Sequence, residues 1–327
     1  MSYYATVVIP TFNGEKYLKE ILTILFKQEV DYKYEVLIID SGSTDKTLDI
    51  VRKFQSKHSN LRLHQIPNSE FGHGKTRQLA ARLAKGKYVA YLSHDATPAN
   101  KKWLYEMLKP FEFNDKIVAV MGQQIPRPHC IPLLKYEILA TFSNFGPEFG
   151  TTVFYKDDFI TDRAVFDAVR FYSDVNSATR RDFLLNKIPY RDVAYAEDQL
   201  FGEDVINAGY WKAYAPRGAV VHSNDLKLSE YRRRLFDETI GLRKSGVTIP
   251  VLSKRRMILI ATKKIVGDSI RIIKDRSYSF SRKIYWLLVN PLYNIEKWRG
   301  IYAATHVKLD DHSTIAKHSL EASRKSS

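Results

Sequence analysis

The chain has 327 residues, of which 44% are hydrophobic and 27% are charged, so it can bury a large core and is not a disordered protein. Its formal net charge of +15 indicates an anionic partner such as nucleic acid or a lipid surface. The single cysteine, Cys130, excludes an intramolecular disulfide, and no apolar stretch reaches the roughly 18 residues that span a bilayer.

Strand and helix patterns alternate through the first hundred residues. Strand-like runs occupy 5–10, 34–40, 61–67 and 88–96, and helical patterns occupy 15–28, 48–55 and 74–86. This alternation predicts a mostly parallel sheet with helices on both faces. In such sheets, ligands bind where the carboxyl ends of the strands open into loops.

Polar side chains occupy three of those predicted loops. Thr11 and Asn13 follow the first strand, Asp40 ends the second, and Asp95 follows the strand at 88–92. A carboxylate at a strand end can accept hydrogen bonds from a base or a ribose, although turn formation is an alternative role for Asp40. No GxGxxG or GxxxxGK[ST] motif follows the first strand, which argues against a dinucleotide enzyme and a P-loop NTPase.

Four segments carry a resemblance to a known family. They are VVIPTFNGEKYLKEIL, VLIIDSGSTDKTLDI, GKTRQLAARLAKGKYVAYLSHDATP and AEDQLFGEDVINAGY. In this order they resemble the motifs of glycosyltransferase family 2, which are inverting enzymes of GT-A fold that use nucleotide sugars, over about residues 4–225. FGHGKTRQLA and LSHDATP are similar to the bacterial rhamnosyltransferase branch, whose donor is dTDP-L-rhamnose.

The resemblance implies a divalent metal, Mg²⁺ or Mn²⁺, that bridges the donor phosphates. The family's strand ends in Asp-x-Asp, and here the first acid is replaced by Ser93 while the last is Asp95. One carboxylate suffices where phosphate and water complete the coordination. His222 is a candidate second ligand, with a packed or capping histidine as the alternative.

The resemblance also implies a donor site. Arg77 matches the family's arginine near the base and phosphates, and Lys75 is a neighbouring cation, with solvated surface charge as the alternative for both. The residues predicted to bind the donor nucleotide are Pro10, Thr11, Asn13, Asp40, Lys75, Arg77 and His94.

A base must take the proton of the acceptor hydroxyl during inversion. By resemblance to the family's Glu-Asp motif, Asp198 is the predicted base and Glu197 a supporting residue, and the two point about 100° apart on a helix. Asn176, Ser177 and Trp211 are predicted in the acceptor site, although core packing is an alternative for Trp211.

The pattern changes to basic helices after residue 225. Residues 251–300 carry 12 Lys and Arg against three acids, which is +9 of the +15. Their apolar, aromatic and cationic side chains are typical of an interfacial helix, with packing on a second subunit as the alternative. We therefore predict a GT-A catalytic domain at 1–225, a helical basic region at 226–305 and a disordered polar tail at 306–327.

The functional hypothesis is a rhamnosyltransferase of bacterial cell-surface polysaccharide synthesis that acts on a glycan or lipid-linked saccharide. Donors based on UDP, and a basic nucleic-acid-binding protein on an α/β scaffold, are the alternatives. The second lacks a recognised nucleic-acid module. With no basic segment before the first apolar run, we expect the protein in the cytoplasm, with a peripheral position on the inner face of the membrane as one option. Packing of the basic helices on a second subunit would make it a homodimer.

Overall fold

The structure is a computed structural model that describes residues 3–157, 159, 162–193, 195–224, 226–244 and 246–325. The chain divides into two compact units. The first comprises Met1–Arg127 and Ile138–Ser223, and the second comprises Pro128–Glu137 and Asn224–Ser327. The sequence placed one boundary near residue 225, whereas the short segment at 128–137 also belongs to the second unit.

The first unit holds a sheet of nine strands, counted over the described residues, in the order β3-β2-β1-β4-β8-β6-β9-β5 with β7 paired to β9. The strands are β1 (Tyr3–Thr11), β2 (Tyr34–Asp40), β3 (Leu61–Gln65), β4 (Gly86–Leu92), β5 (Thr97–Pro98), β6 (Ile117–Ile125), β7 (Thr152–Phe154), β8 (Asn176–Arg180) and β9 (Trp211–Val221). The helices are α1 (Glu15–Leu25), α2 (Thr47–Gln55), α3 (His73–Leu83), α4 (Trp103–Leu108), α5 (Pro132–Ser143), which begins in the second unit, α6 (Arg163–Arg170), α7 (Arg181–Asn186) and α8 (Glu197–Asn207), with 3₁₀ turns at Asn68–Glu70 and Lys109–Glu112.

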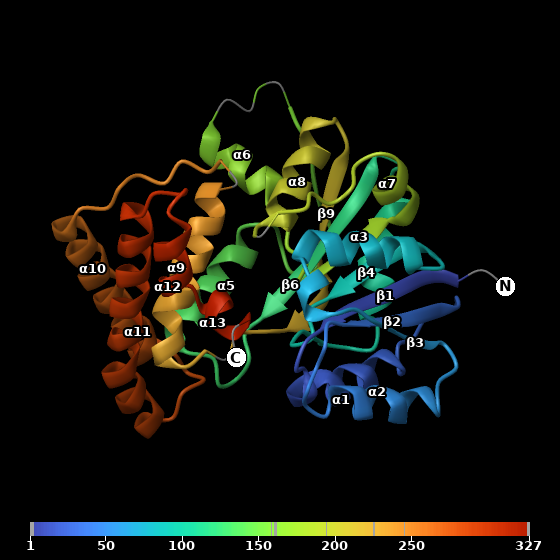
Figure 1. Cartoon of the computed structure of the whole chain (residues 1–327), viewed down its shortest axis with the longest axis horizontal. Coiled ribbons are helices and arrows are strands. Elements are labelled where there is room, and N and C mark those ends of the chain that lie inside the picture. Colours follow the sequence, from blue (N-terminus) through green and yellow to red (C-terminus); the bar gives the residue numbers. More distant parts are fainter. Residues whose placement is uncertain are drawn as a thin grey trace. The chain divides into compact units, whose positions relative to one another are not determined.

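The sheet confirms the predicted α/β class of GT-A type. β1 to β4 are parallel to one another, and β6 and β9 are parallel to each other. β8 runs antiparallel to both β4 and β6, so β4, β6 and β9 all point in the same direction. Helices cover both faces, with α1 and α2 on one and α3, α7 and α8 on the other (Figure 1). The carboxyl ends of β1, β2, β4 and β9 therefore meet at one edge.

The core of the first unit lies between the sheet and α1. Val7, Ile9 and Ile38 point from the strands toward apolar side chains of α1, all without solvent exposure. The α1 residues Leu18, Ile21, Leu22 and Leu25 repeat at helical spacing, as the sequence predicted. Because each buried Leu or Ile side chain contributes about 1.5–3 kcal/mol, this face alone fixes α1 on the sheet.

One lysine lies inside the first unit. Lys212 on β9 has no solvent exposure, and its amine has no hydrogen-bond partner among the described residues. The amine lies 4.1 Å from the centre of the Phe154 ring and 6.0 Å from that of Phe145. Burial lowers the pKa of Lys212 to about 7, so the side chain is partly neutral at physiological pH.

The second unit is helical. Its elements are α9 (Leu228–Lys244), α10 (Lys254–Lys274), α11 (Phe280–His306), α12 (His312–His318) and α13 (Leu320–Lys325). Phe236, Ile240 and Ala304 join α9 to α11, and Ile272 and Trp286 join α10 to α11. No helix among the described residues is both long and apolar enough to cross a membrane.

The polar tail differs from its prediction, because residues 312–325 form α12 and α13 where the sequence indicated disorder. Asp311 caps α12 by accepting a hydrogen bond from the amide of Thr314. Asp237 on α9 accepts from the amides of Leu320 and Glu321 at 2.9 and 3.1 Å. Local composition did not reveal the contact with Asp237, because that residue lies about 80 positions upstream of α13.

Candidate active site

The loops after β1 and β2 are bonded together at the carboxyl edge of the sheet. Asp40 is completely buried and accepts hydrogen bonds from the hydroxyls of Thr11 and Ser43 and from the amides of Gly42 and Ser43. Asn13, whose φ is +50°, accepts from the amide of Thr44 at 2.9 Å. Asp40 therefore orders the loop and presents no exposed oxygen to a nucleotide, which favours the turn role left open by the sequence. Pro10 and Thr11 lie beside Asp40 as the last residues of β1, and Asn13 is exposed.

The second group of site residues joins the ends of β4 and β9. Asp95 and His222 are 127 positions apart in the sequence, yet His222 Nε2 lies 3.4 Å from Asp95 Oδ2. The pairing follows from topology, because β4 and β9 run in the same direction and end at the same edge. Burial acts to raise the pKa of Asp95, but the charge and hydrogen bond of His222, helped by His94, hold it at about 2.

Gln124 orients the His222 ring. Its Nε2 donates to Ser173 Oγ at 3.1 Å, so its oxygen is the atom that faces His222 Nδ1 at 2.9 Å. Nδ1 must then carry the proton, and in a neutral imidazole Nε2 presents a lone pair toward the Asp95 carboxylate. Two facing lone pairs require either a proton on Nε2 or a cation held between them. This donor set fits a divalent cation, although the described residues contain no group of three candidate ligands.

Arg127 holds the backbone of the Asp95 loop in place. Its Nη2 donates to the Asp95 carbonyl at 2.7 Å, and its guanidinium lies 3.7 Å from the centre of the Tyr17 ring. A cation stacked on an aromatic ring and bonded to a backbone carbonyl holds a loop without neutralising the carboxylate beside it. The sequence gave no indication of this role, because Arg127 lies among turn residues in PRPHC.

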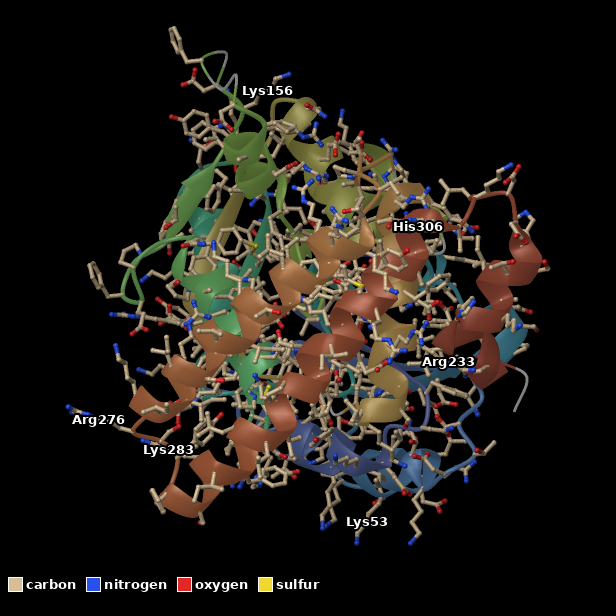
Figure 2. All side chains as sticks on the ribbon, turned by 90° about the vertical axis from the view of Figure 1, so that its left-hand side faces the viewer. Lys53, Lys156, Arg233, Arg276, Lys283 and His306 are labelled. Carbon is tan, nitrogen blue, oxygen red and sulfur yellow. The ribbon has the colours of Figure 1, made fainter. Side chains whose placement is uncertain are left out.

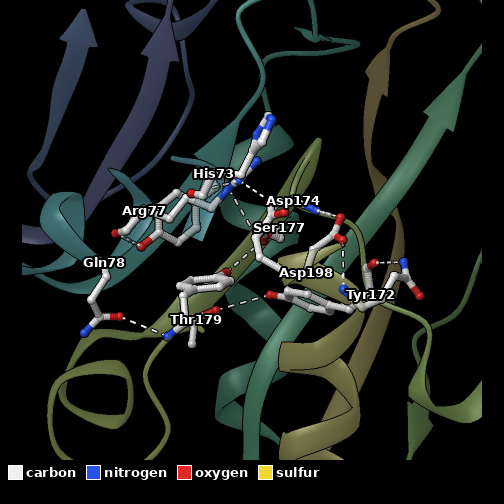
Figure 3. Close-up of polar contacts among 12 residues, drawn as sticks. His73, Arg77, Gln78, Tyr172, Asp174, Ser177, Thr179 and Asp198 are labelled. Carbon is white, nitrogen blue, oxygen red and sulfur yellow. Dashed lines mark hydrogen bonds and ion pairs between the residues drawn. The ribbon is translucent and has the colours of Figure 1, made fainter. Parts of the chain in front are cut away.

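Arg77 and the carboxylates of Asp174 and Asp198 lie close together on the other side of the site (Figure 3), and Glu197 is paired with the same guanidinium. Arg77 on α3 donates through Nη1 to Glu197, and its Nε lies 3.2 Å from Asp174 Oδ2. Asp174 is buried and accepts from Ser177 Oγ at 2.6 Å and from Tyr190 Oη at 2.9 Å. The guanidinium of Arg77 is thus paired with two carboxylates. This arrangement does not agree with the predicted contact between Arg77 and the donor phosphates.

Asp198 is the third carboxylate and the one that reaches the surface. Its Oδ2 accepts from the amide of Asp174 at 3.3 Å, and its Oδ1 from the amide of Gln199 at 2.8 Å. Burial and then the charges of Glu197 and Asp174 raise the pKa of Asp198 to about 8, against the effect of Arg77. Because the side chain stays partly exposed, Asp198 can meet a ligand as a strong proton acceptor.

A short loop at residues 171–175 connects the two sides. Its Val175 carbonyl accepts from the amide of Ser93 at 3.1 Å, and its Ser173 hydroxyl accepts from Gln124. Its Asp174 contacts Arg77 through the side chain and Asp198 through the backbone. The Asp95–His222 pair and Asp198 are therefore positioned by one loop, which the sequence analysis did not single out.

The predicted acceptor residues do not form a site. Asn176 is buried, accepts from Trp103 Nε1 at 2.9 Å and donates to the Gly218 carbonyl at 2.7 Å. Ser177 is buried against Asp174. Trp211 begins β9, at the edge opposite His222, and packs on Tyr155 with ring centres 5.3 Å apart. Asn176 and Ser177 are therefore engaged inside the unit, whereas Trp211 is half-buried at the opposite edge, so the structure does not bring the three together.

Two remaining donor residues lie near the site loops. His94 packs over Gly14 at the start of α1, where an added Cβ would lie 3.5 Å from the imidazole ring. Lys75 on α3 is exposed, which suits a phosphate contact as well as a solvated surface charge.

The sequence matches known proteins over this same region. The model of the family described as "Glycosyl transferase family 2" matches residues 6–185. The O-antigen chain rhamnosyltransferase WbaN of Salmonella anatum is 32% identical over 236 residues, which cover 71% of this chain and 70% of that protein. RfbN of Salmonella typhimurium, described in the same words, is 29% identical over the same shares.

Solved structures share the fold. The mannosyltransferase PcManGT of Pyrobaculum calidifontis, in complex with GDP-Man and Mn²⁺, superposes with a TM-score of 0.55 at 17% identity, covering 100% of this chain and 89% of that one. TarS 1–349 of S. aureus in complex with UDP-GlcNAc superposes with a TM-score of 0.52 at 20% identity, covering 96% and 79%. The arrangement of strands and helices described above is thus that of known sugar-transferring enzymes.

Proposed function

The chain belongs to glycosyl transferase family 2, and from this premise we propose that it transfers L-rhamnose from dTDP-L-rhamnose, with inversion, to a saccharide acceptor of cell-surface polysaccharide synthesis. The similarity to two O-antigen rhamnosyltransferases supports the sugar. The observation that carries the chemistry is the placement of two carboxylates with opposite properties, Asp95 and Asp198, on either side of the 171–175 loop.

Asp95 and His222 form the donor side. They would hold Mg²⁺ or Mn²⁺ as two protein ligands, and Gln124 keeps the imidazole in the tautomer that offers Nε2. A cation bound there supplies positive charge to the diphosphate as it leaves. Lys75 is available to add to that charge, whereas Arg77 is engaged by Glu197 and Asp174.

Asp198 forms the acceptor side. As the acceptor oxygen attacks the anomeric carbon, its proton passes to the Asp198 carboxylate, and the electron pair of the breaking C–O bond goes to the diphosphate. Attack opposite the leaving group inverts the anomeric centre. Burial, Glu197 and Asp174 raise the pKa of Asp198, while the ion pair with Arg77 engages the carboxylate of Glu197.

We further propose that the acceptor is lipid-linked and that the protein works on the inner face of the membrane. The support is that both relatives are named as O-antigen chain rhamnosyltransferases, together with the basic helical second unit of this chain. A homodimer, in contrast, has no support in the described residues of this single chain.

A donor screen tests the proposal. Melting temperatures would be recorded with Mn²⁺ and dTDP-L-rhamnose, UDP-GlcNAc, UDP-glucose or GDP-mannose, since a ligand at 100 times its Kd stabilises the fold by about 2.7 kcal/mol. We expect the largest shift with dTDP-L-rhamnose, and NMR of the product should show the inverted anomer. A larger shift with a UDP sugar would replace rhamnose by that sugar, and retention of configuration would contradict the role of Asp198.

A further inference from the structure

The α10–α11 pair in the second unit exposes an unusual amount of apolar surface. Leu259 on α10 is 69% exposed, and Phe280 and Leu288 on α11 are 79% and 71% exposed. Large contiguous apolar surfaces are rare on proteins that contact only water. Other exposed apolar residues of the pair are Ile258, Val266, Ile270, Ile273, Ile284, Tyr285, Leu292 and Ile295.

These side chains form stripes that are separate from the packed face of each helix. On α10 the buried positions are Ala261, Asp268 and Ile272, whereas the stripe is Leu259, Val266, Ile270 and Ile273, which share another face at helical spacing. On α11 the stripe repeats every four residues, at Phe280, Ile284, Leu288 and Leu292. The pairing of α10 with α11 already uses the buried faces, so the stripes are not needed for the core of the unit.

The surface beside the stripes is strongly cationic. Exposed Lys and Arg residues along α10 and the following turn are Lys254, Arg255, Arg256, Lys263, Lys264, Arg271, Lys274 and Arg276. Figure 2 shows α10 and α11 running side by side across the near face, with Arg276 extending outward from the turn between them.

The three acids of the same stretch do little to neutralise these cations. Asp268 is buried, accepts from Asn290 and Asn294 at 3.3 and 3.0 Å, and lies 3.7 Å from one of the cations, Arg271. Asp275 is bonded to Lys135, and Glu296 to Arg299. The excess positive charge therefore remains on the surface that also carries the apolar stripes.

We propose that this α10–α11 surface docks on an anionic lipid leaflet, with the apolar stripes entering the boundary of the acyl chains and the cations contacting the headgroups. Apolar side chains flanked by Lys and Arg are what an interfacial helix requires. A second copy of the chain is a poorer occupant, because a symmetric contact would bring two sets of like charges together. Docking does not depend on the donor sugar proposed above.

Vesicle flotation of the full chain tests the surface. The probes are phosphatidylcholine vesicles and vesicles with about 30% phosphatidylglycerol, each at 50 and 300 mM salt. We expect binding to the anionic vesicles at least about 10-fold stronger than to neutral ones, and a loss of about 10-fold at the higher salt, where charges are screened over shorter distances. Equal binding to both vesicles, or none, would overturn the proposal.

Two sets of substitutions separate the contributions. The preference for anionic lipid should be lost when four cations of α10 are replaced together, in Arg255→Gln, Arg256→Gln, Lys263→Gln and Lys264→Gln. It should be retained in the matched control, which removes four cations of the first unit with Lys27→Gln, Arg52→Gln, Lys53→Gln and Lys57→Gln. Leu259→Asn, Val266→Asn and Leu288→Asn should weaken binding about 10-fold or more, and Phe113→Asn, Leu139→Asn and Val165→Asn serve as the matched control.

Sedimentation of the same proteins without lipid tests the rival occupant. We expect the parent and the α10–α11 variants to have the same mass. A parent that self-associates, a triple apolar variant that does not, and no flotation of either would assign the surface to a second copy and overturn membrane docking. Because neither donor nor acceptor is present, these results stand apart from the outcome of the donor screen.

Discussion

The loop that carries Asp95 and the helix start that carries Asp198 use the same side chain in opposite ways. Asp95 is paired with His222, and its pKa is held at about 2. Asp198 meets Glu197 and Asp174, which share a single arginine, and its pKa is raised to about 8. Burial acts to raise both pKa values, so it does not explain why they differ. The difference between the two pKa values follows from the neighbouring charges, which are a histidine beside Asp95 and two carboxylates beside Asp198. One carboxylate is thus prepared to stay charged beside a cation, and the other to exchange a proton.

The largest effect on transfer should come from removing Asp95, the carboxylate with the lowered pKa. Asp95→Ala should reduce transfer by about 10³-fold, because the cation that would neutralise the leaving diphosphate would lose the charged one of its two protein ligands. EDTA should have a similar effect on the parent, reversed by Mn²⁺. Asp49→Ala, which removes an exposed acid from α2, is the control. Full activity in EDTA would leave Lys75 to neutralise the leaving group.

The next largest effect on transfer should come from removing Asp198, the carboxylate with the raised pKa. Asp198→Asn should lower turnover by about 10²-fold or more while donor binding, measured by titration, stays close to the parent. In the parent, kcat/KM should rise with pH and reach half its maximum near pH 8, since the ionised carboxylate is the active form, and this rise should vanish in the variant. A more severe loss in Glu197→Gln would move the base to Glu197.

Removing the histidine next to Asp95, which makes its surroundings more like those of Asp198, should have an intermediate effect on transfer. His222→Gln removes the imidazole beside Asp95, so the pKa of Asp95 should move up toward its ordinary range. Loss of one of the two proposed protein ligands should also lower the affinity for Mn²⁺ by about 10–100-fold. Saturating Mn²⁺ should restore much of the activity. The ligand role of His222 is refuted if the variant shows the parent's dependence on Mn²⁺.

A smaller change tests the network around Asp198. Tyr190→Phe removes a donor to Asp174, so the pKa of Asp174 should rise and its negative charge near Asp198 should decrease. The pKa of Asp198 should then fall, and the midpoint of the pH profile should move to lower pH, with a loss of activity of roughly 10-fold or less. A purely structural role for Tyr190 would lower stability without moving that midpoint.

The smallest effect on transfer is expected for Lys212→Met, which checks that the pH profile belongs to Asp198, because Lys212 also titrates near neutral pH. Stability should change instead. Between about pH 7 and 10.5 the unfolded lysine binds a proton that the folded one has lost, so the parent gains stability as pH rises. The variant should therefore be more stable by up to about 4 kcal/mol at pH 7 and below, and this advantage should shrink toward pH 10.5. Thermal melts across pH would reveal it.

Periodic patterns predicted the fold well because they record burial. The alternation of strands and helices to residue 96, and the helical pattern after residue 225, correspond to the observed elements. Periodicity did not predict that β8 runs antiparallel between β4 and β6, and that reversal brings the 171–175 loop to the site edge.

The structure brings predicted site residues together where the prediction used their positions at strand ends. Asp95 and His222 were identified in this way, and the structure brings them together. Asn176, Ser177 and Arg77 carry polar groups that could bind a ligand, but these groups are already bonded to other residues of the chain. Those partners are distant in the sequence, so no local pattern reveals them. Gln124, Asp174 and Tyr190 were missed for the same reason, since their importance lies in contacts with residues distant in the sequence.

The position of β9 in the sheet has a consequence for the order of folding during synthesis. Domains generally fold from the amino terminus as the chain emerges from the ribosome. The parallel strands β1 to β4 can pair once residue 92 is out, but β8 and β6 must be added before β9 can deliver His222 to Asp95. A nascent chain that ends before residue 222 therefore holds half of the donor side, so any truncation within β9 should leave a chain with much of its core and no complete site.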